Sequence, residues 1–187
     1  MCVRHDGSHR HLVIVIEFRV AVDDDWEAIW PIFRDVVASG DTYAFPPDID
    51  SAEAETTWMA AGRDRRRTYV AERDGEIVAT AYVRPNQPGL GDHVANAGWM
   101  VAPSAAGQGI GRRFAEYVIG DARSLGFTGM QFNAVVATNT GAIRLWESLG
   151  FEIVGTVPDA FRHATEGLVP IHVMYRGLSR DDRGCSG

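Results

Sequence analysis

The feature of this sequence that most constrains its fold is a run of glycines at alternate positions near the middle of the chain. An apolar segment, residues 97–102, ends at Pro103, and Gly107, Gly109 and Gly111 follow. Apolar and aromatic residues then recur at the spacing of one helix face, at Ile110, Phe114, Tyr117 and Val118. The pattern predicts a strand, a glycine loop and the first turn of a helix. Such an arrangement presents unpaired backbone N–H groups at the positive end of a helix, and it therefore favours binding of a diphosphate.

The residues around the glycines exclude two common phosphate-binding loops. A Walker loop ends in Gly-Lys-Ser or Gly-Lys-Thr, whereas Gly111 is followed by Arg112 and Arg113. A Rossmann fingerprint has the spacing G-x-G-x-x-G near the start of a βαβ unit and an acidic residue at the end of the next strand. This chain has the spacing G-x-G-x-G, and no acidic residue stands at the corresponding place. The glycine loop is therefore of another kind.

Two motifs together indicate which kind. Residues 101–111 resemble the pyrophosphate-binding loop of the GNAT superfamily, the acyl-CoA-dependent N-acyltransferases. Residues 139–151 resemble the last helix of that superfamily and the strand that follows it. Two motifs in the right order are far more specific than either alone, and the resemblance extends from about Leu12 to about Tyr175. It implies a GNAT-like α/β fold, in which helices flank a central mixed sheet, and acetyl-CoA as the co-substrate.

Length and composition indicate the class of protein. With 187 residues, 45% of them hydrophobic, the chain is expected to form one domain over residues 12–178, with flexible tails at 1–11 and 179–187. A net charge of −7 argues against a nucleic-acid partner, because binding phosphates requires a basic surface. The apolar run at residues 12–16 is too short to span a membrane. Cys2 and Cys185 make no disulfide framework or metal-ligand spacing, so we expect no metal site and a cytoplasmic location.

Hydrophobic periodicity and turn signals predict the order of strands and helices. Strands are expected at residues 12–20, 68–72, 76–83, 96–102, 129–136, 151–157 and 171–175. One helix is expected to be capped by an aspartate among residues 23–25, and others to span residues 51–61, 109–124 and 141–149. The sequence Arg73-Asp74-Gly75 predicts a hairpin turn. The elements together predict a mixed sheet with helices on both faces.

The resemblance to the superfamily implies where the cofactor is held. Backbone N–H groups of residues 107–111 would bind the pyrophosphate, and the glycines would let it approach closely because they lack a Cβ. Arg112 would add a positive charge or lie on the solvated helix surface. Asn139 would contact the pantetheine arm, cap the last helix, or do both. The residues assigned to the cofactor are Met100, Val101, Gly107, Gln108, Gly109, Ile110, Gly111, Arg112, Asn139 and Trp146.

Acyl transfer to an amine needs a route for the amine's proton and a donor for the developing oxyanion. The resemblance places Asn96 where some members have a glutamate, and an amide cannot take the proton directly. Asn133 is expected either to act on the substrate or to bridge neighbouring strands as a structural amide. The backbone N–H of Val101 would bind the oxyanion. Trp146 stands where many members have a tyrosine acid, so we expect it to wall the pantetheine channel or to belong to the core.

A narrower resemblance concerns the acceptor. Residues 41–45 and 157–163 are similar to segments of acetyltransferases that act on the proline analogues azetidine-2-carboxylate and cis-4-hydroxyproline. This implies a small amine or imino acid as acceptor, oriented by Asn96 and Asn133 directly or through water, with His163 lining the substrate pocket. His93 and His172 are other candidate bases. The superfamily resemblance also suggests a homodimer.

Two alternatives for the function stay open. One is acetylation of a protein N-terminus or lysine. The other is an acyl-CoA-binding regulatory module without turnover, because Asn96 and Trp146 replace the usual acid–base pair.

Overall fold

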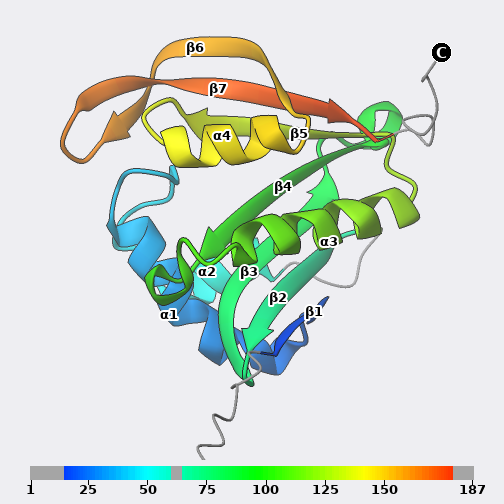
Figure 1. The fold of residues 1–187 in the computed structure, drawn as a ribbon. Helices are drawn as coiled ribbons and strands as arrows, with labels where there is room; N and C mark the ends of the chain where they lie inside the picture. The colour runs from blue at the N-terminus through cyan, green and yellow to red at the C-terminus, as the bar shows by residue number, and fades with distance from the viewer. Residues whose placement is uncertain (1–14, 60–64, 179–187) are drawn as a thin grey trace, which may run out of the picture.

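In the residues that the structure describes, a seven-stranded mixed sheet forms the centre of the molecule (Figure 1). The computed structural model describes residues 15–59 and 65–178. The strands are β1 (Ile16–Val20), β2 (Arg67–Arg73), β3 (Glu76–Pro85), β4 (Val94–Val101), β5 (Gly129–Val136), β6 (Glu152–His163) and β7 (Gly167–Gly177). Their order is β1-β2-β3-β4-β5-β7-β6; β4 and β5 pair in parallel, and the other neighbours are antiparallel.

Within the described ranges, four α-helices cover the two faces of the sheet, as predicted (Figure 1). On one face, α1 (Trp26–Ala38) and α2 (Ser51–Trp58) bury the side chains of Ile29, Phe33 and Trp58. On the other, α3 (Ile110–Ser124) and α4 (Thr140–Ser148) cover a second hydrophobic cluster. Short 3-10 turns lie at Asp23–Asp25 (η1), Gly89–Gly91 (η2) and Pro103–Ala105 (η3). The sheet thus separates two hydrophobic cores, and a site at a gap in the sheet can be reached from both.

The predicted helix starts and turns agree with the structure at most places. Gly109 is the N-cap of α3, and the β2–β3 turn has positive φ at Asp74 (53°) and Gly75 (84°), as a two-residue hairpin requires. The prediction that an aspartate side chain caps α1 is wrong. Asp25 precedes the helix, but its carboxylate accepts from the Val22 N–H and binds Arg19 instead of capping.

Parts of several predictions lie outside the described residues. These are residues 12–14 of the first strand, residues 60–61 of the second helix, both predicted tails, and both cysteines. In the part of the chain that is described, no helix is long and apolar enough to cross a membrane, and no cluster of His, Cys, Asp or Glu side chains could hold a metal ion.

The last two strands are longer than predicted. The segment 157–163, expected to precede the last strand, lies inside β6, and β7 begins at Gly167 instead of Ile171. The pairing of β6 with β7 shifts register between Val157 and Phe161, where Asp159 has a φ of 52°. This irregularity lets the strand continue past Pro158, whose missing N–H would otherwise interrupt the ladder.

A second register shift changes which side chains of β5 are buried. Strict alternation would place Val135 on the same face as Asn133. Instead, the pairing with β7 shifts between Phe132 and Val135, so that Asn133 and Ala134 are exposed. Val135 is buried in the same cluster as Phe132. Simple alternation of buried and exposed side chains therefore ends at Phe132.

The two parallel strands at the centre of the sheet separate from each other. β4 pairs with β5 only from Val94 to Asn96, whereas its antiparallel pairing with β3 continues to Val101. Figure 1 shows β4 and β5 together at one end and well apart at the other. Beyond Asn96, the β5-facing edge of β4 therefore lacks a strand partner, and we call this place the fork.

Three wholly or partly buried tyrosines predict a loss of stability at alkaline pH. Burial raises the pKa of Tyr43, Tyr69 and Tyr82 above the usual value of 10.0, and for Tyr69 the hydrogen bond to Asp121 adds to this. The folded state therefore keeps these protons where the unfolded state loses them. The stability that these phenols contribute is fully present below the pKa that they have in the unfolded chain, and it is lost as the pH rises above that pKa.

We therefore expect the free energy of unfolding in urea to fall above about pH 10, by up to ~1.4 kcal/mol per pH unit for each phenol. Tyr69→Phe removes one titrating group, and its unfolding free energy should fall less steeply with pH. An unfolding free energy that stays constant up to about pH 11 would contradict this.

Candidate functional site

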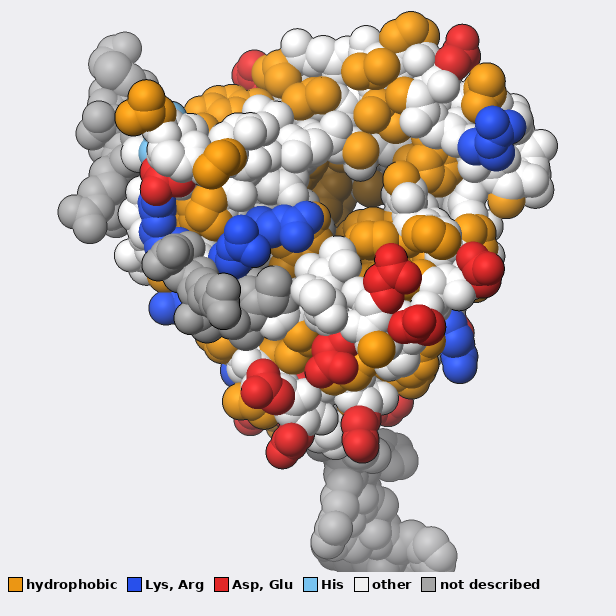
Figure 2. Space-filling view, turned by 180° about the vertical axis from the view of Figure 1, so that it is seen from behind, with side chains coloured by type: hydrophobic (Ala, Val, Ile, Leu, Met, Phe, Trp, Pro, Cys, Tyr) orange, Lys and Arg blue, Asp and Glu red, His pale blue; other side chains and the backbone are white. Residues whose placement is uncertain are grey.

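A cavity opens at the fork, where β4 and β5 separate. Its volume is about 390 Å³, within the range of small-molecule sites. Residues from the α1–α2 face of the sheet line it: Thr42, Tyr43, Ala44, Phe45 and Tyr82. So do residues from the α3–α4 face: Trp99, Phe132, Asn139, Ala142 and Trp146. Figure 2 shows a hollow bordered by hydrophobic side chains in the middle of one face of the molecule.

Backbone groups of β4 point into the fork. The Ala102 N–H donates to the Val78 carbonyl at 2.8 Å, and hydrogen-bonded pairs alternate along an antiparallel ladder. The N–H and C=O groups of Trp99 and Val101 therefore face away from β3, toward the gap beside β4. In agreement with this, the Trp99 carbonyl accepts a hydrogen bond from the Tyr43 hydroxyl at 2.8 Å. The N–H of Val101 thus points to the side where an oxyanion donor is expected.

Stacked and tilted aromatic rings form the wall of the cavity below α4. The ring centroid of Trp146 lies 4.9 Å from Trp99 and 4.7 Å from Phe132. Trp146 is buried and also lines the cavity, so it belongs to the core and to the cavity wall. The indole N–H of Trp99 and the hydroxyl of Thr42 are buried, and neither has a hydrogen-bond partner among the described residues. Buried donors of this kind are normally paired, so both fit a ligand that carries oxygen acceptors.

Asn96 sits at the point where the fork begins. Its Nδ2 donates to the Gln131 carbonyl of β5 at 3.1 Å, and its Oδ1 accepts from the Tyr82 hydroxyl at 3.1 Å. The side chain is buried and also lines the cavity. Asn96 therefore ties β4 to β5 and fixes the Tyr82 ring.

Asn133 of β5 also lines the cavity and is exposed. Its Nδ2 donates to Asn86 Oδ1 at 2.7 Å, and its Oδ1 accepts from Gln131 Nε2 at 2.8 Å. Asn86 follows β3 directly, so this chain of amides connects β5 to the end of β3. Both readings of Asn133, a structural bridge and a substrate-orienting amide, fit this position.

The cavity contains two tyrosines that stay protonated at neutral pH. Burial raises the pKa of Tyr43 well above its usual range, and burial also raises that of Tyr82, although the positive charge of Arg84 partly offsets the effect. Neither phenol can therefore act as a base. None of the described lining residues is an aspartate, glutamate, lysine or histidine.

His163, expected at the substrate pocket, is not one of the residues that line the cavity. Its Nδ1 accepts from the backbone N–H groups of Thr165 and Glu166, so the ring stabilises the β6–β7 turn. His93 and His172 are not lining residues either. The cavity wall is thus without an imidazole in the described part of the chain.

The glycine loop follows β4 directly and leaves its backbone exposed. Gly107 and Gly109 have φ of 73° and 74°, and no atom lies within 4 Å of where a Cβ would be on either. Gln108 holds the shape of the loop, because its Oε1 accepts from Arg73 at 3.0 Å and its Nε2 donates to the Ser104 carbonyl at 2.9 Å. The loop therefore offers exposed amides on a fixed frame.

The other residues assigned to the cofactor occupy different environments. The side chains of Ile110 and Met100 are buried in the two opposite cores. Arg112 donates to Ser148 Oγ at 2.9 Å and pairs with Glu116, so it bridges α3 to α4. Asn139 caps α4, because its Oδ1 accepts from the Ala142 N–H at 3.1 Å, and it also lines the cavity.

Sequence reasoning missed several residues of the site, notably Tyr82, Arg84 and Trp99. The available signal was the repetition of polar side chains at every second position of a strand, Thr80, Tyr82 and Arg84. Such a strand has one polar face in an otherwise apolar setting. That face lies against α2, where Trp58 Nε1 donates to Thr80 Oγ1 at 2.9 Å.

Comparison with known proteins agrees with this geometry. A family model described as the acetyltransferase (GNAT) family matches residues 24–151. The chain is 40% identical over 108 residues to the N-acetyltransferase aca1 of Schizosaccharomyces pombe. The matched segment covers 57% of this chain and 52% of that protein. The match thus spans about half the length of this relative.

Solved structures show the same fold over nearly their whole length. A GCN5-related N-acetyltransferase from Kribbella flavida superimposes with a TM-score of 0.83 and 47% identity, over 87% of this chain and 97% of that one. A GNAT superfamily phosphinothricin acetyltransferase from Sinorhizobium meliloti, solved in complex with acetyl-CoA, gives a TM-score of 0.80 at 22% identity over 91% of this chain and 92% of that one.

Proposed function

Since this chain belongs to the GNAT family of N-acetyltransferases, we propose that it transfers an acetyl group from acetyl-CoA to the nitrogen of a small amine or imino acid. The observation that supports this most is the cavity at the fork, which is lined from both faces of the sheet. A cofactor on the α3–α4 side and an acceptor on the α1–α2 side can meet there. The volume of about 390 Å³ suits a small acceptor.

The residues that would hold acetyl-CoA follow from the geometry. The backbone amides of residues 107–111 would bind the pyrophosphate, and Asn139 and Trp146 would contact the pantetheine arm. The unpaired indole N–H of Trp99 would donate to a carbonyl oxygen of that arm. When bound, acetyl-CoA supplies the acetyl group as a thioester.

We also propose how the chain's own groups assist the transfer. The N–H of Val101 would donate to the oxygen that gains negative charge, a contact worth about 2.7–4 kcal/mol in other enzymes. No described side chain of the cavity wall can serve as a base at neutral pH. Asn96 and Asn133 would instead order a water that takes the proton, or bind the acceptor nitrogen in its neutral form.

A cyclic imino acid is the acceptor that this arrangement suits best. The cavity wall combines aromatic rings with amide groups, so it can pack a small ring and hydrogen-bond a polar group at its edge. A protein N-terminus or lysine remains the alternative acceptor. A binding module without turnover is the alternative of another class.

Thiol release from acetyl-CoA by the full chain tests these proposals. We expect release with azetidine-2-carboxylate and cis-4-hydroxyproline to exceed release with spermidine, lysine or peptides. Activity on spermidine or peptides alone would overturn the choice of acceptor. Tight calorimetric binding of acetyl-CoA with no release for any acceptor would instead identify a regulatory module.

A further inference from the structure

The cavity contains a single charged side chain among its described lining residues, and that side chain is Arg84. This is unexpected for a chain with 25 acidic and 18 basic residues. In Figure 2, basic side chains border one side of the hollow, whereas acidic side chains gather mainly lower on that face. The electrostatic character of the cavity is thus opposite in sign to that of the whole molecule.

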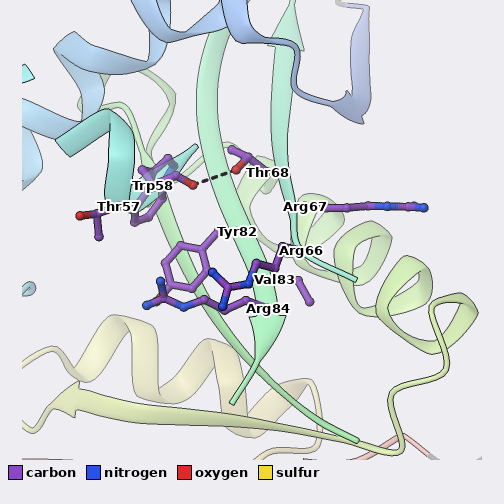
Figure 3. A pocket seen from close by; sticks show the side chains of 8 residues that line it. All are labelled: Thr57, Trp58, Arg66, Arg67, Thr68, Tyr82, Val83 and Arg84. Atoms are coloured by element: carbon purple, nitrogen blue, oxygen red, sulfur yellow. Dashed lines mark hydrogen bonds between the residues drawn. The ribbon is translucent and has the colours of Figure 1, made fainter. Parts of the chain in front are cut away.

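The guanidinium of Arg84 is held in place by a ring. Its Cζ lies 4.5 Å from the ring centroid of Tyr82, and Nη2 lies 3.5 Å from the Tyr82 hydroxyl. The Tyr82 ring in turn lies across Gly98, because a Cβ on that residue would come within 2.7 Å of Tyr82 Cε1. Figure 3 shows Arg84 and Arg66 both reaching toward the Tyr82 ring. The ring therefore positions the charge at the wall of the cavity.

Within the described part of the chain, Arg84 has no carboxylate partner, in contrast to two other arginines that are partly buried. Arg19 pairs with Asp25 and Glu72, and Arg67 pairs with Asp121. Among the described residues, no carboxylate lies within 4.0 Å of the Arg84 guanidinium. A half-buried guanidinium carries five N–H donors in a planar arrangement that matches a carboxylate. Apart from Nη2, which lies near the Tyr82 hydroxyl, its donors have no hydrogen-bond partner among the described residues and are therefore available to a ligand in the cavity.

The position of Arg84 also fits the acceptor side. Arg84 of β3 pairs with Asn96 of β4, and two residues along the same ladder Tyr82 pairs with Gly98. All four positions belong to the face covered by α1 and α2, the face opposite the aromatic wall below α4. A group bound to Arg84 would thus lie beside Asn96, away from the side proposed for the cofactor.

We propose that Arg84 binds a carboxylate of the acceptor and so selects amino and imino acids over amines without an acid group. This inference rests on the proposed acetyl transfer to a small acceptor. It assigns the carboxylate to Arg84 and leaves Asn96 and Asn133 to the nitrogen. A polyamine would be repelled by Arg84 and would find no described carboxylate on the cavity wall.

The test compares matched acceptors with matched variants. Steady-state thiol release is measured with azetidine-2-carboxylate, its uncharged 2-carboxamide, and azetidine. The enzymes are the unsubstituted chain, Arg84→Gln, which keeps hydrogen-bond donors but loses the charge, and Arg84→Lys, which keeps the charge. Arg66→Gln is the control, because Arg66 lies nearby but does not line the cavity.

In the unsubstituted chain we expect the acid to exceed the carboxamide in kcat/KM by about tenfold or more, as loss of a charge-assisted contact predicts. Arg84→Gln should raise the KM for the acid by a similar factor, bring the acid-to-carboxamide ratio close to one, and leave the KM for acetyl-CoA within about twofold. Arg84→Lys should keep part of the preference for the acid over the carboxamide, and Arg66→Gln should keep all of it.

Two results would overturn the inference: equal use of acid and carboxamide by the unsubstituted chain, or an unchanged ratio in Arg84→Gln. Saturation-transfer NMR of the acceptor with each variant separates binding from turnover, and an unchanged thermal midpoint shows that the variants fold. Failure of the proposed function looks different, because the unsubstituted chain would then release no thiol with any of the three acceptors.

Discussion

Replacing Gly109 with valine is expected to reduce acetyl-CoA binding by about 100-fold or more while the chain still folds. Gly109 has a φ of 74° and is the N-cap of α3, and nothing lies within 4 Å of the position of an added Cβ. The valine side chain would therefore extend into the open space above the loop amides, where we place the pyrophosphate. Loss of two charge-assisted hydrogen bonds of about 1.5–3 kcal/mol each accounts for the size of the effect.

The chain offers a matched control for the strain of that substitution. Gly75, in the β2–β3 turn, has a φ of 84° and equally open surroundings. Gly75→Val should therefore suffer a similar backbone penalty, about 1–2 kcal/mol, without touching the loop. Titration calorimetry with acetyl-CoA should find nearly normal affinity for Gly75→Val. Equal affinities for the two variants would show that the loop does not hold the cofactor.

Replacing Asn96 with alanine is expected to lower both stability and turnover. The change leaves the Gln131 carbonyl and the Tyr82 hydroxyl without their present partner inside the protein. We expect the free energy of unfolding to fall by about 1–3 kcal/mol, because an unpaired buried group incurs the full loss of its hydration. Turnover should fall by about tenfold or more, since the Tyr82 ring and the start of the fork would both lose their fixed positions.

Asn133→Ala is the informative comparison. Asn133 is exposed and its partners, Asn86 and Gln131, are side chains that water can reach. Its loss should change the free energy of unfolding by no more than about 0.5 kcal/mol. If Asn133 orients the acceptor, turnover falls in this variant while acetyl-CoA affinity is kept. Normal turnover in Asn133→Ala would show that Asn133 serves only as a structural bridge. Unchanged stability in Asn96→Ala would show that Asn96 does not tie β4 to β5 at the fork.

The sequence predicted those parts of the fold that local chemistry decides. The spacing of Gly107, Gly109 and Gly111 predicted a loop between strand and helix, and Asp74 and Gly75 predicted a hairpin, because positive φ angles are easiest for these residues. The mixed sheet with helices on both faces followed from periodicity. The family model and the solved relatives are in agreement with that class.

The sequence did not predict features that depend on pairing between distant strands. The shift between Phe132 and Val135 depends on β7, and the extension of β6 past Pro158 depends on its ladder with β7. The position of Arg84 beside Asn96 depends on the register of β3 with β4. No pattern within one segment reports such a register, so the charge in the cavity became visible only in three dimensions.

The connection between α1 and α2 has a consequence for how the protein can diversify. Residues 42–45 of this loop form part of the cavity wall, and only the hydroxyl of Tyr43 ties their side chains to β4 by a described hydrogen bond. The glycine loop lies on a separate segment, after β4. The rings of Tyr43 and Phe45 also pack against Trp58 and Phe33 of the α1–α2 core. Changes at Thr42 and Ala44, which lie between and beside these rings, can therefore alter which acceptors fit without rebuilding the core or the cofactor loop. In directed evolution, Thr42 and Ala44 are the positions of this loop where new acceptor preferences can be sought at little risk to folding.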